Sequence, residues 1–125
     1  MKILQKVVVK QVLTEKSKLE LSEKLNEKKL QLQKEHEQLR FERKKLESTT
    51  SYPSPAARIY EKEMKQRLEK IKNIDFQIQQ LHMLPLGSEL KEKEVQAMVD
   101  VNVGDNWVDL DKTIIIKEGK VIEIR

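Results

Sequence analysis

The chain has 125 residues, no cysteine, a net charge of +4 and 37% charged residues. The length corresponds to one domain, and without cysteine there is neither a disulfide framework nor a thiolate metal site. No apolar run reaches the length of a membrane span, so we expect a cytoplasmic protein in a reducing compartment. The charge is uneven: residues 1–85 contain 19 Lys/Arg against 12 Asp/Glu, whereas residues 86–112 contain 3 against 7.

Residues 2–13 are rich in β-branched side chains and predict a first strand. Lysines recur at positions 2, 6 and 10, whereas Val7, Val9 and Leu13 have the opposite parity, so one face of this strand should be buried. Thr14 follows as a candidate N-cap, and Ser17 with Glu20 offers an alternative capping box.

Residues 14–85 predict two long helices that form an antiparallel hairpin. The first carries four leucines at seven-residue spacing, which return to one side of a helix: Leu25, Leu32, Leu39 and Leu46. Charged residues occupy the alternate positions of this apolar row: Lys28, Glu35 and Glu42. A second row repeats every eleven residues: Leu19, Leu30 and Phe41. The apolar surface of the first helix is therefore thin.

The second helix has the clearer amphipathic pattern, with apolar residues at Met64, Leu68, Ile71, Ile74, Ile78 and Leu81. Serines, threonines and two prolines at 48–55 predict the turn between the helices. Within it, Ser54 suits an N-cap and Pro55 the first helical position. Pro85 and Gly87 end the second helix, and Phe76 lies off its apolar stripe, where it could pack on the strands or on a second chain.

After Gly87 the apolar period changes to two. Alternation over residues 95–103 predicts a strand, 104–106 a turn and 107–110 a short strand. Residues 113–117 and 120–124 flank Glu118-Gly119, a two-residue hairpin signal. The fold class is α+β: a small antiparallel β-sheet or partly open barrel from residues 1–13 and 86–125, with the coiled-coil-like hairpin of 14–85 inserted after the first strand.

Four segments resemble the YlqD family of bacterial proteins: KILQKVVVKQVLTE at 2–15, MLPLGSE at 83–89, VDVNVGDNW at 99–107 and GKVIEI at 119–124. The resemblance covers essentially the whole chain. It implies no particular activity, ligand or catalytic residue. It does imply a gene context beside ribosomal-protein, ribosome-maturation and tRNA-modification genes, which favours a ribosomal partner.

The sequence offers little for catalysis, and we expect no enzyme, no cofactor and no metal. No cysteine is present, the serines lie in caps and turns, and His36 and His82 have no suggestive neighbours. The acidic stretch at 100–105 has Gly where a calcium loop needs a ligand, and solvent-facing strand acids explain it better. The three glycines are too dispersed for a phosphate-binding loop.

One feature favours a binding function. Folding the hairpin brings basic residues from both helices to its far end, where they could contact RNA phosphates: Arg40, Arg43, Lys44, Lys45, Arg58, Lys62, Lys65 and Arg67. Tyr52 and Tyr60 are available for base stacking. The alternative is an ordinary solvated helix surface, on which these cations pair with acids at helical spacing. Trp107 is either a core or edge residue or, if exposed, part of a protein-binding patch.

The sequence therefore predicts a non-enzymatic macromolecular interaction module. Its basic hairpin end would contact RNA or a ribosomal particle, and its strands would contact protein. The alternative is a self-associating structural protein, in which a second hairpin completes the thin apolar surface of the first as a dimer. The two differ in salt dependence, because phosphate contacts weaken steeply with salt and an apolar interface does not. No membrane and no small-molecule substrate is expected.

Overall fold

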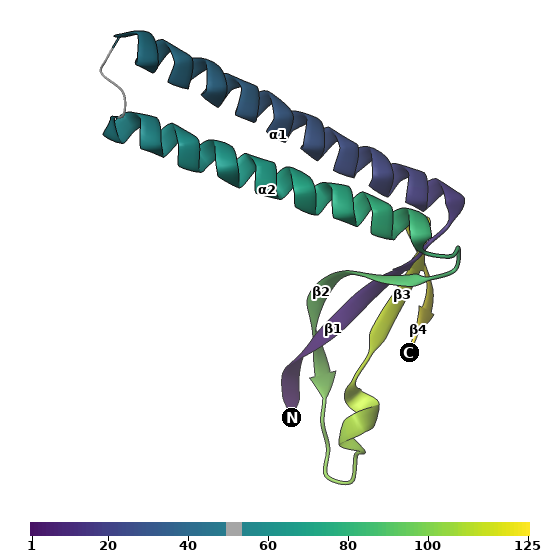
Figure 1. The fold of residues 1–125 in the computed structure, drawn as a ribbon. Helices are drawn as coiled ribbons and strands as arrows, with labels where there is room; N and C mark the ends of the chain where they lie inside the picture. Colours follow the sequence, from purple (N-terminus) through teal and green to yellow (C-terminus); the bar gives the residue numbers. More distant parts are fainter. Residues whose placement is uncertain (50–53) are drawn as a thin grey trace. The chain divides into compact units, whose positions relative to one another are not determined.

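The computed structural model describes residues 1–49 and 54–125, in an α+β fold (Figure 1). The chain divides into two compact units, a β unit of residues 1–18 and 84–125 and a hairpin unit of residues 19–83. The elements in chain order are β1 (Lys2–Val12), α1 (Glu15–Thr49), α2 (Pro55–Met83), β2 (Glu89–Asp100), the 3-10 helix η1 (Trp107–Leu110), β3 (Thr113–Lys117) and β4 (Lys120–Ile124). The predicted insertion of a helical hairpin after the first strand is confirmed.

The four strands form one open, mixed sheet in the order β2-β1-β3-β4. β1 pairs with β2 and β3 with β4 in antiparallel fashion, whereas β1 and β3 are parallel. The purely antiparallel pairing expected from the sequence therefore fails at one ladder. The cause is the segment 101–112, the crossover, which carries the chain from β2 to the other side of β1. The β3–β4 turn has Glu118 at φ 48° and Gly119 at φ 81°, as a type I′ hairpin requires.

Residues 107–110 form the 3-10 helix η1, so the strand predicted there is wrong. The side chain of Asn106 caps this helix by accepting a hydrogen bond from the amide of Val108 at 3.3 Å. Asp105 accepts a hydrogen bond from the amide of Asn102 at 2.8 Å and closes the preceding turn. Asn and Asp side chains that bond to the nearby backbone compete with strand pairing. Here they favour a 3-10 helix in a short apolar segment whose sequence alone suggests a strand.

The core of the β unit is small. Its buried apolar side chains are Val7, Val9, Leu13 and Ile115. The two edge strands approach each other at one end, where the guanidinium of Arg125 donates to both carboxylate oxygens of Glu89 at 2.6 and 2.9 Å. This hydrogen-bonded guanidinium lowers the pKa of Glu89. The sheet is thus curled and held at that end by an ion pair, and it is not closed by a strand ladder.

Both predicted helix starts are confirmed. The Thr14 hydroxyl accepts from the amide of Ser17 at 3.1 Å, and the Ser17 hydroxyl accepts from the amide of Thr14 at 2.8 Å, so the capping box is Thr14 with Ser17. Ser54 accepts from the amide of Ala57 at 3.2 Å, which makes Pro55 the first residue of α2. At the other end, α1 extends to Thr49, past the predicted turn start at 48. Residues 50–53, with Tyr52, lie outside the described part of the chain.

The seam, meaning the rows of α1 and α2 that face each other, follows the leucine heptad on α1. On α2 it follows partly or fully buried residues at alternating three- and four-residue spacing: Ala57, Tyr60, Met64, Arg67, Ile71, Ile74, Ile78 and Leu81. Leu68, predicted as a seam residue, is 49% exposed, and Arg67 takes its place. The eleven-residue row of α1 is exposed along its whole length. An ion pair between Lys29 and Asp75 at 2.6 Å joins the two helices.

Candidate nucleic-acid interface

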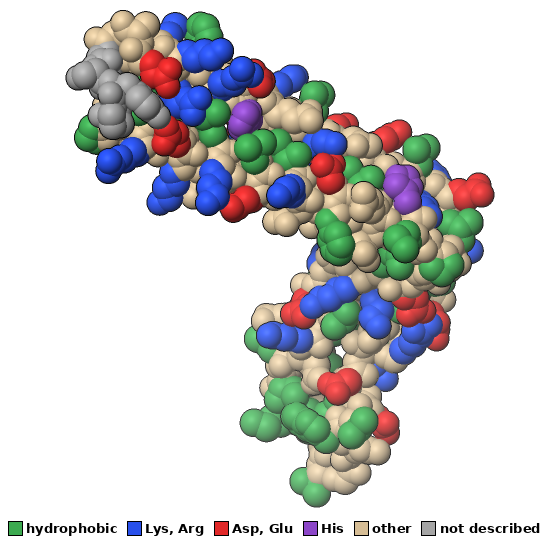
Figure 2. Space-filling view, viewed as in Figure 1, with side chains coloured by type: hydrophobic (Ala, Val, Ile, Leu, Met, Phe, Trp, Pro, Cys, Tyr) green, Lys and Arg blue, Asp and Glu red, His purple; other side chains and the backbone are tan. Residues whose placement is uncertain are grey.

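The basic residues singled out from the sequence come from the last part of α1 and the first part of α2. These helices are antiparallel, so both groups lie at the tip, the end of the hairpin where α1 ends and α2 begins (Figure 1). Figure 2 shows Lys and Arg side chains over this part of both helices, with a few acidic side chains between them. The structure therefore brings the predicted cluster together at one end of the hairpin unit.

Three of the four arginines at the tip, Arg40, Arg43 and Arg67, lie close to acids of their own helices. Arg40 lies 3.7 Å from Glu37, and Arg67 forms an ion pair with Glu63. The Nε of Arg43 is buried without a hydrogen bond, with the nearest Glu47 oxygen 3.7 Å away. For these arginines the alternative interpretation, cations neutralised at helical spacing, describes the structure well.

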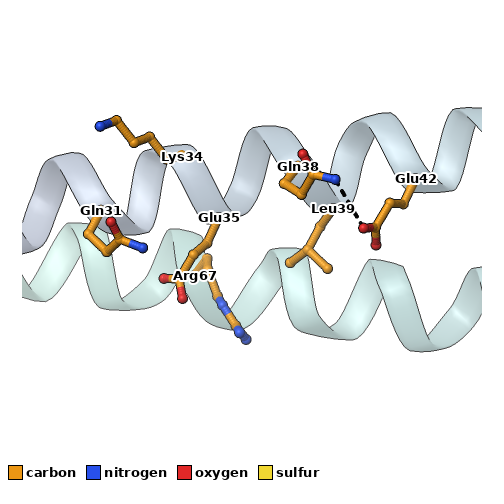
Figure 3. A pocket seen from close by; sticks show the side chains of 7 residues that line it. All are labelled: Gln31, Lys34, Glu35, Gln38, Leu39, Glu42 and Arg67. Carbon is orange, nitrogen blue, oxygen red and sulfur yellow. Dashed lines mark hydrogen bonds between the residues drawn. The ribbon is translucent and has the colours of Figure 1, made fainter.

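Arg67 belongs to the seam and not to the outer surface of the tip. It lines an open cavity of about 430 Å³ between the two helices. Figure 3 shows Glu35 of α1 pointing towards α2, with the guanidinium of Arg67 directed away from the Glu35 carboxylate and Leu39 further along α1. The full lining is Gln31, Lys34, Glu35, Gln38, Leu39, Glu42 and Arg67. In this part of the seam charged side chains stand where a helix pair normally packs apolar ones.

A second cavity of about 430 Å³ adjoins the first and shares two of its lining residues, Gln31 and Glu35. It also contains Leu32 and Ile74, so apolar surface of the seam is accessible from this side. Neither cavity has a nucleophile beside a base among its lining residues. The charged residues in both linings are Lys, Arg and Glu, which have long, flexible side chains. The two openings form a groove along the hairpin and do not resemble a catalytic pocket.

Four cations of the tip differ from the paired arginines. They are exposed, and none has an acidic partner within ion-pair distance in residues 1–49 and 54–125: Lys44, Arg58, Lys62 and Lys65. We call these the tip cations. Three of them follow at four- and three-residue spacing on α2 and so share one side of the helix. At 1.5 Å rise per residue, this row extends over about 10 Å.

Aromatic side chains contribute less to the tip than the sequence suggested. Tyr60 is partly buried in the seam, and Tyr52 lies outside the described residues. Sequence reasoning instead missed Phe41, which is 55% exposed and carries the ammonium of Lys45 4.7 Å from its ring centroid. This cation–π pair could have been predicted from the four-residue spacing of Phe41 and Lys45, which places them next to each other on a helix.

Other site types receive no support from the described residues. No group of three or more His, Asp or Glu side chains in the described part of the chain could hold a metal ion. His36 lies 3.8 Å from Glu37 on the same helix, without a nucleophile nearby. Neither α1 nor α2, over the residues described, is both long and apolar enough to cross a membrane.

Comparison with known proteins gives a consistent assignment. The model of the YlqD protein family matches residues 1–125. The chain is 48% identical to the uncharacterised protein YlqD of Bacillus subtilis (strain 168), over 100% of the chain and 98% of the relative. The crystal structure of a protein of unknown function from Synechococcus sp. WH 8102 is similar, with a TM-score of 0.76 and 17% identity, covering 100% of this chain and 94% of the other. At that identity the similarity establishes the shared fold alone.

Proposed function

The chain belongs to the YlqD family, and we propose that it is a non-enzymatic interaction module whose hairpin tip binds RNA phosphates, with a ribosomal particle as the partner. The single observation that supports this function best is the set of four tip cations without acidic partners. Elsewhere on the tip, over the residues described, Arg40, Arg43 and Arg67 lie beside acids at helical spacing, and the ammonium of Lys45 lies over the ring of Phe41.

Electrostatics favours a phosphate partner for this set. The row on α2 presents three positive charges, Arg58, Lys62 and Lys65, on one side of a helix, and Lys44 adds a fourth from α1. Each phosphate that such a cation neutralises releases condensed counterions, so binding depends on salt with a slope of about 0.7 to 0.9 per phosphate. Four contacts correspond to a weak, salt-sensitive interaction, in keeping with a module that binds a large particle through more than one surface.

The proposal is tested by co-sedimentation with purified ribosomal particles across a salt series. The test variant changes Lys44, Lys62 and Lys65 to Gln. A matched control changes three lysines away from the tip, Lys16, Lys24 and Lys117, which are also exposed. We expect the test variant to lose affinity and to lower the salt slope by about 2, while the control, with the same net charge, retains the slope of the wild type. Equal binding by the two variants, or no binding by the wild type at low salt, would refute the tip as a phosphate-binding surface.

The seam groove favours self-association as a second candidate function. Leu32, Leu39 and Ile74 line its two cavities, and a helix from a second copy lying there would cover this apolar surface. Sedimentation velocity at low and high salt distinguishes the two candidates. A dimer that persists in high salt supports the groove as an apolar interface, whereas a monomer at all salt concentrations would refute self-association through the groove.

A further inference from the structure

The crossover of the β unit exposes large apolar side chains that belong to no core. Trp107, the one tryptophan of the chain, is 65% exposed, Val108 is 72% exposed, and Val103 is fully exposed. Figure 2 shows hydrophobic side chains gathered over the end of the β unit that carries the crossover. We call Val103, Trp107 and Val108 the crossover surface. Tryptophan is enriched at protein interfaces because it buries a large area with few rotatable bonds.

The backbone beneath this surface is well fixed. The amide of Val101 donates to the carbonyl of Met1 at 2.8 Å, which extends the β1–β2 ladder into the crossover. At the other end, the side-chain amide of Gln5 donates to Asp111 at 2.5 Å. Between these two anchors, the Asp105 turn and the Asn106 cap hold η1 in place. Trp107 is therefore presented outward by a segment tied to β1 at both ends, and a pre-organised surface loses little conformational entropy on binding.

The segment that carries the crossover surface has an excess of negative charge, and the positive groups beside it are the amino group of Met1, which donates to the carbonyl of Val101 at 3.1 Å, Lys2, the cross-strand partner of Asp100, and Lys112. Residues 99–111 contain four aspartates and no Lys or Arg. All four are exposed, and the carboxylates of Asp100 and Asp109 have no hydrogen-bond or ion-pair partner in the part of the chain that the structure describes. An apolar patch with an acidic rim attracts cations and repels anions. The tip has the opposite character, so the two surfaces select different partners.

The apolar and acidic character of the crossover surface favours one class of binding partner. RNA and anionic lipid are repelled by the four carboxylates. In a symmetric dimer through the crossover surface, each patch would face its own copy and bring Asp100 and Asp109 close to their counterparts. We propose that the crossover surface binds a basic, apolar segment of another protein, whose apolar side chain packs on Trp107 and whose Lys or Arg pairs with Asp100 and Asp109. This inference concerns the β unit and is independent of phosphate binding at the tip.

The test starts from random peptides displayed on phage, selected on the full-length protein. Binders are then synthesised, and their affinity is measured through the fluorescence of Trp107, the sole tryptophan. An exposed tryptophan emits as in water, so docking of an apolar side chain shifts its emission to shorter wavelength. The matched control for Trp107→Ser is Phe76→Ser, because Phe76 is an aromatic residue of similar exposure, 61%, on the hairpin unit. These two variants are compared by phage retention.

We expect the selected peptides to combine Lys or Arg with apolar residues. Trp107→Ser should reduce their retention about ten-fold or more, as loss of a central aromatic does at interfaces, and Phe76→Ser should leave it unchanged. The double variant Asp100→Asn/Asp109→Asn should lower the affinity several-fold at low salt and less at high salt. Selected peptides without positive charge, or retention that is the same for both aromatic variants, would overturn the proposal. Dimerisation that Trp107→Ser abolishes would also overturn it, by identifying a second copy as the occupant.

Discussion

Ile74 and Leu68 of α2 make the sharpest test of the seam, because the structure separates two residues that look alike in the sequence. Ile74 is 9% exposed and lies in the seam, whereas Leu68 is 49% exposed. Replacing a buried isoleucine by alanine costs about 2 to 5 kcal/mol. Full burial of a leucine contributes about 1.5 to 3 kcal/mol, and Leu68 is only half buried. Leu68→Ala should therefore cost about 1 kcal/mol or less, also because alanine favours the helix.

Urea denaturation followed by circular dichroism at the helix band measures both effects. With a slope of about 2 kcal/mol per molar urea, Ile74→Ala should lower the midpoint by about 1 M or more, and Leu68→Ala by about 0.5 M or less. If Ile74→Ala does not fold, Ile74→Val provides the comparison, at an expected cost of about 0.5 to 1.5 kcal/mol. A Leu68→Ala midpoint as low as that of the Ile74 variant would place Leu68 in the seam and refute the assignment of Arg67 there.

Three further predictions follow from the site and the caps. Arg67→Gln should leave co-sedimentation with ribosomal particles unchanged, because Arg67 is paired with Glu63 in the seam, whereas Lys62→Gln should weaken it; equal loss by both would contradict this distinction. Thr14→Ala should cost about 1 kcal/mol in urea denaturation through loss of the N-cap, and Thr14→Ser should not. Arg125→Gln should raise the pKa of Glu89 toward its ordinary value, as measured by carboxyl NMR titration. In the wild type, the lowered pKa of Glu89 means that the Arg125 ion pair stabilises the fold above the unfolded-state pKa of about 4.3, and that this contribution is lost as the pH falls through the folded-state pKa.

The long elements of the fold could be predicted from the sequence because their signals are repeated many times. The leucines of α1 repeat at three successive seven-residue intervals, and the caps at Thr14 for α1 and at Ser54 for α2 use well-defined side-chain chemistry. The parallel pairing of β1 with β3 could not be predicted, since it depends on the path of the crossover and not on any local pattern. Short runs such as 107–110 were ambiguous, and the Asn106 cap decided between strand and 3-10 helix.

The candidate site was predictable in its location but not in its composition. The sequence places the basic residues at the tip, yet only the structure shows that Arg43 and Arg67 are partly buried while Lys62 and Lys65 are exposed. The reason is a one-residue ambiguity in α2: Arg67 and Leu68 both lie within reach of the seam at three- and four-residue spacing, and the apolar residue is the natural choice. In the structure Arg67 is the residue that lies in the seam. Its long apolar stem can pack there while its guanidinium pairs with Glu63.

The opposite charges of the tip and the crossover make the two proposed surfaces separable by experiment. Both interactions weaken with salt, so salt alone does not assign a binding partner to either surface. Substitution does, because removing positive charge at Lys62 and Lys65 weakens an anionic partner such as RNA, and removing negative charge at Asp100 and Asp109 weakens a basic partner. A ribosomal particle offers both chemistries, since it contains RNA and basic proteins. Loss of co-sedimentation by both sets of variants would therefore indicate that one particle engages the tip and the crossover together, with avidity that exceeds either contact alone.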